Sequence, residues 1–236
     1  MQEYFVEGEY LPGDVIELPA DKAHHAFRVL KLNHETVRLV RDGTGFFAEA
    51  YQENGRGLAR IIEQDVSINE LPVSVTLCMA LIRREKFELV LQKACELGVS
   101  RIVPFESSRC VVHDKADRSK KQTQRRNAIL LEASEQCKRN LVPVCEEPVS
   151  FLELRNYRSE MNLAAYEAAD HTDLRIFSLP EASSVTVVIG PEGGFSQEEM
   201  RWLSDQGFSV ITLGNRILRA ETAAITACAL LGERYS

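Results

Sequence analysis

The stretch VVIGPEGGFSQEE, Val187–Glu199, contains the end of a strand, a glycine turn and the start of a helix. The β-branched run before Gly190 is typical of a buried strand. Ser196, followed three residues later by Glu199, forms a capping box that marks the first turn of a helix. A buried strand that leads through glycines into a capped helix is typical of an α/β domain with a mainly parallel sheet.

The same alternation extends over the chain from Val73 onward. Continuous apolar runs indicate buried strands, and amphipathic runs that end near Gly98 or Gly207 indicate helices. We expect strands in 73–81, 101–105, 162–167, 185–190 and 209–214, and helices in 83–98, 120–139, 196–207 and 221–235. The sequence therefore predicts an α/β domain over residues 73–236.

Residues 1–70 have a different pattern, with short strand-forming runs separated by glycines. Asp42-Gly43 is a hairpin signal between two of these runs. One amphipathic stretch, 20–32, is predicted to be a short helix. We expect strands in 4–8, 14–19, 36–43 and 46–53. The sequence thus predicts a small β-rich domain over residues 1–70, joined to the α/β domain by a linker near Pro72.

Charge is unevenly distributed along the chain. The formal net charge is -7, but residues 83–139 contain fourteen Lys and Arg against eight Asp and Glu, a local charge of +6. Residues 1–70 contain seven basic and thirteen acidic side chains. Because a local patch matters more than the total, the basic middle favours an anionic partner such as RNA.

Composition excludes several classes of protein. No apolar run reaches 18 residues, so no membrane-spanning helix is expected. The acidic N-terminus has no apolar segment typical of a signal peptide, which favours the cytoplasm. The six cysteines include no C-x-x-C pair and are expected to be reduced, buried thiols. No cluster with metal-ligand spacing surrounds His24 and His25, so no metal site is expected.

A second unusual turn lies in LGNRILRAETAA, Leu213–Ala224, which also follows a predicted strand. Two loops at the carboxyl ends of neighbouring parallel strands should face one crevice. Ile217 and Leu218 suit a flat aromatic ring such as adenine, although they could also fill the core. The glycines fit neither the dinucleotide fingerprint nor the phosphate-binding loop, which disfavours both ligands. The alternative for Gly190–Gly194 is a tight turn without ligand.

Lys and Arg are frequent in the middle of the chain. They occur in residues 83–109, in the stretch KADRSKKQTQRR (Lys115–Arg126) and in CKR, which ends at Arg139. They could contact phosphates, each contact steepening the salt dependence of binding. The alternative is a solvated helix face.

Taken together, GPEGGFS, LGNRILRAETA, KACELGVSRIVPF and the Glu-Gln of SEQCKR resemble the ribosomal RNA uracil-N3 methyltransferases of the SPOUT superfamily. The resemblance spans essentially the whole chain. It implies a PUA-like, RNA-binding β-barrel over 1–70 and a trefoil-knotted methyltransferase domain over 73–236. It also implies a homodimer that binds S-adenosylmethionine in the knot and methylates N3 of one uridine in 16S (small-subunit) ribosomal RNA, free or within the 30S particle.

The resemblance assigns roles to particular residues. Uracil N3 must lose a proton before it attacks a methyl group, so a base or a stabilised anion is needed. Glu221 or Glu192 could accept the proton, and Arg216 or Arg219 could stabilise the anion. The catalytic candidates are therefore Arg219, Glu221 and Glu192. The cofactor-binding candidates are Gly190, Gly193, Gly194, Leu213, Gly214, Ile217, Leu218, Ala220 and Thr222. The substrate-binding candidates are Arg83, Lys86, Lys93, Arg109, Arg139, Arg216 and Arg28, with His24, His25 and Lys31 as further local candidates.

Two other functions remain open at the level of sequence. A non-catalytic RNA-binding module for ribosome assembly would explain the basic middle and the barrel, but not the two loops. An oxidoreductase or other nucleotide-dependent α/β enzyme lacks its usual fingerprint. Binding of the cofactor by the isolated protein discriminates the first alternative from a methyltransferase.

Overall fold

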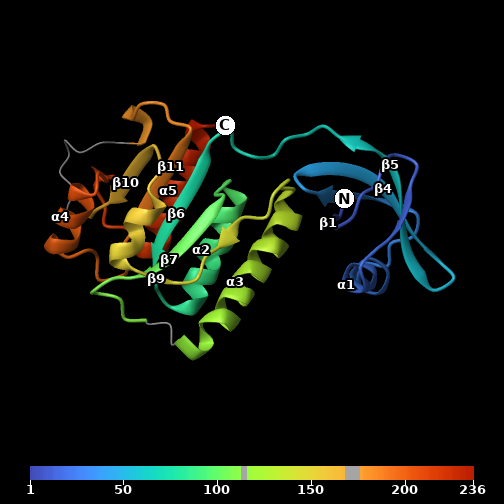
Figure 1. Ribbon diagram of the computed structural model, residues 1–236, viewed down its shortest axis with the longest axis horizontal. Helices are drawn as coiled ribbons and strands as arrows, with labels where there is room; N and C mark the ends of the chain where they lie inside the picture. Colours follow the sequence, from blue (N-terminus) through green and yellow to red (C-terminus); the bar gives the residue numbers. More distant parts are fainter. Residues whose placement is uncertain (113–115, 168–175) are drawn as a thin grey trace. The chain divides into compact units, whose positions relative to one another are not determined.

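The chain divides into two compact units. The structure, a computed structural model, describes residues 1–112, 116–167 and 176–236 (Figure 1). The N-terminal unit comprises residues 1–70 and 134–141, and the C-terminal unit comprises 71–133 and 142–236. No pattern in the sequence indicated that 134–141 would group with the first seventy residues. Lys115, from the basic stretch that begins there, lies outside the described residues.

The N-terminal unit is built on a five-stranded sheet of order β1-β3-β4-β5-β2. β1 pairs with β3 in parallel, and the other pairs are antiparallel. Asp42 and Gly43 have φ of 48° and 81°, as a two-residue hairpin turn requires, so the predicted hairpin is confirmed. The strands are β1 (Glu3–Phe5), β2 (Val15–Glu17), β3 (Glu35–Arg41), β4 (Thr44–Glu53) and β5 (Arg56–Asp65).

Strand β5 was missing from the sequence prediction. Its inward positions include Gly57 and Ala59, which are too small to give an apolar alternation. A Cβ at Gly57 would stand 2.7 Å from the Phe27 ring, so glycine lets the helical segment pack directly on this strand. That segment consists of α1 (Ala20–His24) and the π-helical turn η1 (His25–Val29).

A buried ionic cluster lies within the N-terminal unit. The Arg38 guanidinium donates to Glu3 and to Asp65, each at 2.6 Å, and all three side chains are nearly inaccessible. Burial raises the pKa of Glu3 even though Arg38 donates to it. Burial opposes ionisation of Asp65 too, but hydrogen bonds from Ser67 and Arg38 outweigh it and lower the pKa of Asp65.

The C-terminal unit contains a seven-stranded sheet in which every pair is parallel. The strand order is β12-β10-β11-β6-β7-β8, and β9 also pairs with β7. Figure 1 shows β10, β11, β6 and β7 side by side. The predicted α/β class with a parallel sheet is confirmed, whereas the two-residue strands β8 and β9 were missed. The strands are β6 (Ser74–Ala80), β7 (Arg101–Glu106), β8 (Val144–Cys145), β9 (Val149–Ser150), β10 (Met161–Ala165), β11 (Ser184–Ile189) and β12 (Ser209–Ile211).

The long helices follow the strands as predicted, namely α2 (Arg84–Glu96), α3 (Ala116–Cys137), α4 (Gln197–Asp205) and α5 (Ala220–Arg234). Two short 3-10 turns are η2 (Phe151–Tyr157) and η3 (Ile176–Ser178). The capping box of Ser196 and Glu199 is present at the start of α4. Helices α2 and α5 pack side by side, and α5 also contacts β6 and β11.

Helices α2 and α5 run in the same direction. Near their first turns Lys86 Nζ lies 3.3 Å from Glu221 Oε1. At their far ends a Cβ on Gly232 would lie 3.2 Å from the Leu97 carbonyl oxygen, so the absence of a side chain permits the close approach. Because both helices follow the carboxyl ends of parallel strands, their N-termini lie at the same edge of the sheet.

Candidate functional site

A cavity of about 440 Å³ lies at the carboxyl ends of β10, β11 and β12. The loops after β11 and β12 line it together, as the sequence predicted. The two strands are not direct neighbours, however, because β10 lies between them and contributes a third wall. Cavities of this size at the carboxyl edge of a parallel sheet are common sites for small ligands.

The first loop, Gly190–Gly194, is anchored by residues outside the cavity lining. The Arg109 guanidinium donates to the carbonyl oxygens of Gly193 and Phe195 at 3.1 and 3.2 Å. The buried Phe195 ring stacks on Phe105 with centroids 6.4 Å apart. Gly194 has φ of +65°, and a Cβ there would collide with the Glu167 carboxylate. The positive φ favours glycine at this position, and any side chain there would displace the Glu167 carboxylate.

The second loop, Leu213–Arg219, presents apolar side chains to solvent. Ile217 is 83% exposed although it lines the cavity, and Leu218 beside it is half-buried. Gly214 has φ of +111°, and a Cβ placed there would meet no atom within 4 Å, so open space adjoins the backbone. An exposed isoleucine at a cavity wall is apolar surface available to a ligand.

Most of the predicted cofactor-binding residues line the cavity. Only Thr222 of that set lies outside the lining, exposed in the first turn of α5. The lining includes Gly190, Gly193, Gly194, Leu213, Gly214, Ile217, Leu218 and Ala220, together with Glu192, Arg216 and Arg219 from the other predicted sets.

Three charged side chains cluster between α2 and the two loops. Lys86 Nζ lies 3.3 Å from Glu221 Oε1 and 3.8 Å from Glu192 Oε1. Glu221 is the most buried of the three, with 12% of its side chain exposed. Its second oxygen, Oε2, is inaccessible and has no hydrogen-bond partner in the described part of the chain. A buried acceptor without a donor is unusual in proteins, and a bound ligand is one way to satisfy it.

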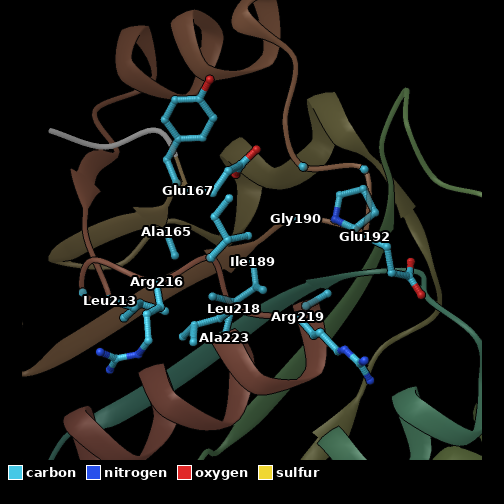
Figure 2. Close-up of a pocket in the computed structure, with 17 residues that line it drawn as sticks. Ala165, Glu167, Ile189, Gly190, Glu192, Leu213, Arg216, Leu218, Arg219 and Ala223 are labelled. Carbon is cyan, nitrogen blue, oxygen red and sulfur yellow. The ribbon is translucent and has the colours of Figure 1, made fainter.

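The two arginines of the second loop point in different directions. Figure 2 shows the side chains of Arg219 and Glu192 on one side of the cavity and the Arg216 guanidinium on the opposite side. Arg219 occupies the N-cap position of α5, where its side chain makes no capping hydrogen bond. Its guanidinium is exposed at the cavity, where it can contact a bound anion.

The other predicted substrate-binding residues lie away from the cavity lining or have other partners. Arg83 is exposed at the N-cap of α2, and Lys93 pairs with Glu96 at 2.8 Å farther along that helix. In the N-terminal unit Arg28 is exposed on η1. Arg139, in the same unit, is buried and its guanidinium binds the Glu70 carboxylate. As it lies, Arg139 is not available to a phosphate.

Sequence reasoning missed the wall that β10 contributes. Ala165, Tyr166 and Glu167 line the cavity directly after this strand. The signal was present, because NLAAYE was recognised as a strand and ends at the same sheet edge. Figure 2 shows the Glu167 carboxylate above Ile189, close to the loop that carries Gly190. The remaining lining residues that were not predicted are Ile189, Pro191 and Ala223.

Other chemistry receives no support from the described residues. Within residues 1–112, 116–167 and 176–236 no group of three His, Cys, Asp or Glu side chains is arranged to hold a metal ion. No helix in the same ranges is long and apolar enough to span a bilayer. All six cysteines are free thiols, and five are buried, whereas Cys137 is partly exposed. Burial raises the pKa of Cys228, on α5, to about 12, so this thiol stays protonated and unreactive at neutral pH.

Comparison with known proteins places these features in a family. Residues 69–232 match the RNA methyltransferase domain family. The chain is 31% identical to ribosomal RNA small subunit methyltransferase E of Bacillus subtilis, over 96% of this chain and 94% of the relative. It is 35% identical to the protein of the same name from Mesomycoplasma hyopneumoniae, over 83% and 88%.

A solved structure agrees over the full length. Ribosomal RNA small subunit methyltransferase E from Neisseria gonorrhoeae, bound to S-adenosyl methionine, superposes with a TM-score of 0.87 at 29% identity, covering 100% of this chain and 98% of that one. With its parallel sheet, its cavity at the carboxyl edge and these relatives, the chain belongs to the RNA methyltransferase family that includes the ribosomal RNA small subunit methyltransferases E.

Proposed function

We propose that the protein is an S-adenosylmethionine-dependent methyltransferase that modifies N3 of a uridine in small-subunit (16S) ribosomal RNA. The observation that carries the proposal is the cavity formed by the loops after β11 and β12. Relatives named as ribosomal RNA small subunit methyltransferases support the activity, and the relative bound to S-adenosyl methionine supports the cofactor.

The cavity residues fit this cofactor in three respects. The exposed Ile217 and its neighbour Leu218 offer an apolar surface to the adenine ring. The open space beside Gly214 admits a ligand close to the backbone. The Glu167 carboxylate can accept hydrogen bonds from ribose hydroxyls or from an amino group. When bound, the cofactor supplies an electrophilic methyl group.

Glu221 is our candidate for the proton acceptor. The Lys86 ammonium holds one of its carboxylate oxygens, and the other, Oε2, has no donor in the described part of the chain. Because Oε2 is buried, RNA binding has to expose it to uracil N3 before it can accept the proton. Glu192 shares the same lysine and carries the second negative charge of the cluster. The cluster thus brings two carboxylates and one ammonium together beside the cavity.

The arginines of the second loop are candidates for stabilising the uracil anion. Loss of the N3 proton spreads negative charge onto the neighbouring carbonyl oxygens, and a positioned guanidinium lowers the energy of that state. Arg219 is the better placed candidate because it lies on the same side of the cavity as Glu192 (Figure 2). Arg216, on the opposite side, is left for contact with the rest of the RNA.

The finer architecture and assembly are also part of the proposal. Support for a trefoil knot comes from the sequence resemblance and from the position of β11, which lies between two strands that precede it in the chain, β10 and β6. We propose that the N-terminal unit is a PUA-like barrel that contacts RNA through residues around Arg28, and that the enzyme is a cytoplasmic homodimer. Sedimentation equilibrium of the purified protein tests the dimer.

Calorimetric titration with S-adenosylhomocysteine tests the cofactor site, because the product form binds without turnover. We expect saturable binding at one site per chain or one per dimer. Incubation with S-adenosylmethionine and 30S particles that lack N3-methyluridine should then yield that nucleoside, detected by mass spectrometry of digested RNA. A folded protein that binds RNA but not S-adenosylhomocysteine would instead be a non-catalytic RNA-binding module.

A further inference from the structure

A second cavity, of about 590 Å³, lies in the C-terminal unit outside the site described above. Its floor is apolar and consists of Leu81 and Ile82, which follow β6, and Phe87 on α2. Its rim comes from α2 and from the N-terminal half of α3. The proposed reaction assigns no role to this cavity, which we call the α2–α3 cavity.

The rim of the α2–α3 cavity is strongly basic. It carries the four cations Arg84, Lys121, Arg125 and Arg126, and Glu88 is the one carboxylate among the described lining residues. Glu88 accepts hydrogen bonds from Arg125 at 2.7 and 3.1 Å and from Arg84 at 2.7 Å. Because cations outnumber carboxylates in this described lining, the rim is complementary to an anion.

Two of these cations differ in their surroundings. Lys121 is exposed and has no carboxylate partner among the residues that the structure covers. Arg126 lies over the Phe87 ring, with its guanidinium carbon 5.0 Å from the ring centroid. The cavity thus combines an exposed ammonium at its mouth with an apolar and guanidinium-lined interior. This combination suits a phosphate attached to a flat base.

Helix α2 separates this cavity from the first one. Lys86 faces Glu192 and Glu221 at the first site, whereas Arg84, Phe87 and Glu88 line the second. Positions 84, 87 and 88 share one face of a helix, and position 86 lies on another. Helix α2 therefore presents one face to the α2–α3 cavity and another to the carboxylates Glu192 and Glu221. An RNA strand that places a uridine at the first site can extend past α2 toward the α2–α3 cavity.

We propose that the α2–α3 cavity binds a nucleotide of single-stranded RNA that flanks the target uridine. Its phosphate lies against Lys121 and Arg125 at the rim, and its base lies toward the apolar floor. This inference rests on the proposed function, because it takes RNA as the substrate. Single-stranded RNA is the favoured occupant, since its bases are exposed and each carries a phosphate.

The test compares single variants of the full-length protein by fluorescence anisotropy with a labelled RNA of about 12 nucleotides that has one central uridine. Lys121→Ala should weaken binding about tenfold, the cost of one charge-assisted contact. It should also reduce the slope of log K against log salt by about 0.7, the value for one phosphate of a single strand. Lys120→Ala is the matched control, because Lys120 is exposed on the same helix but does not line the cavity.

Glu88→Gln should change the affinity for RNA in the opposite direction to Lys121→Ala. Removing the carboxylate frees Arg84 and Arg125 for phosphate, so RNA should bind more tightly than to the wild type. A merely structural role of this cluster would weaken binding in both the Lys121 and Glu88 variants. Equal behaviour of Lys121→Ala and Lys120→Ala, or no binding of the RNA by the wild type at low salt, overturns the inference.

Two further measurements distinguish a failure of this inference from a failure of the proposed function. Titration with S-adenosylhomocysteine should be the same for all the variants and the wild type. If the wild type fails to bind that ligand, the proposed function fails, whatever happens at the α2–α3 cavity. If sedimentation shows that Lys121→Ala changes the oligomeric state while RNA binding is unchanged, the cavity is an interface between copies of this chain, and the RNA inference is wrong.

Discussion

At the scale of single residues, Ile217 is unusual both in the sequence and in the structure. A bulky aliphatic in a turn is unexpected unless it is buried, yet Ile217 is 83% exposed. It therefore contributes little to the core of the folded protein. Its apolar surface is available to the ligand of the first cavity, so its effect should appear in binding and not in stability.

We predict that Ile217→Ala weakens binding of S-adenosylhomocysteine about tenfold, because most of the apolar surface that the side chain buries on the ligand is lost. The melting temperature should be unchanged. Calorimetry measures the first effect and thermal unfolding the second. Leu152→Ala is the control, since Leu152 is 57% exposed and does not line the cavity. Unchanged affinity in the Ile217 variant would place the adenine elsewhere.

We predict that Arg219→Ala lowers kcat by about 10²–10³-fold, the usual effect of removing one group that stabilises an anion in the transition state. Folding should be unaffected, because the Arg219 side chain is exposed and makes no capping bond. Methyl transfer to 30S particles measures the change, with Arg201→Ala, on the exposed surface of α4, as control. Full activity of the Arg219 variant would remove this residue from the mechanism.

At the scale of elements, Glu88 ties helix α2 to helix α3. Hydrogen bonds from Arg125 on α3, opposed by partial burial and reinforced by Arg84, lower the pKa of Glu88 to about 2. The ordinary pKa of a glutamate is 4.5. Because the folded state holds the carboxylate ionised, this contribution to stability is fully present above about pH 4.5. It is lost as the pH falls toward about 2.

We therefore predict that Glu88→Gln lowers the denaturant midpoint of the C-terminal unit at about pH 7. The difference from the wild type should begin to shrink below about pH 4.5 and continue to shrink toward about pH 2. Fluorescence of Trp202, the one tryptophan of the sequence, reports on this unit. A difference that stays constant from neutral pH down to about pH 3 would mean that the ion pair does not stabilise the fold.

At the scale of the whole molecule, the two units differ in sheet topology, in core and in charge. The N-terminal unit has its own apolar core and the buried Arg38 cluster, whereas the C-terminal unit has the parallel sheet. Separate cores allow separate unfolding transitions, so a change in one unit need not unfold the other.

We predict that Arg38→Ala destabilises the N-terminal unit by about 3–5 kcal/mol, since it leaves the carboxylates of Glu3 and Asp65 buried without their cation. Hydrogen exchange of the amides of β3 should accelerate, while the Trp202 transition keeps its midpoint. The loss should be smaller at acidic pH, where the two carboxyls are protonated. Equal destabilisation of both units would show that they unfold together.

Local signals explain why much of the fold was predictable. The capping box at Ser196, the Asp42-Gly43 turn and the long apolar strands are each encoded within a few adjacent residues. Strand β5 was missed because its inward face carries Gly57 and Ala59, whose role depends on the helix packed against them. Strands β8 and β9 are too short to give a periodic pattern.

The sequence by itself determined the alternation of strands and helices, the two loops of the first cavity and the family resemblance, because these depend on neighbouring residues. Only the tertiary structure decided which distant groups meet. It placed Lys86 between Glu192 and Glu221, added Glu167 to the cavity wall and buried Arg139 against Glu70. Contacts between residues far apart in the chain follow from strand order and helix packing, which no local pattern specifies.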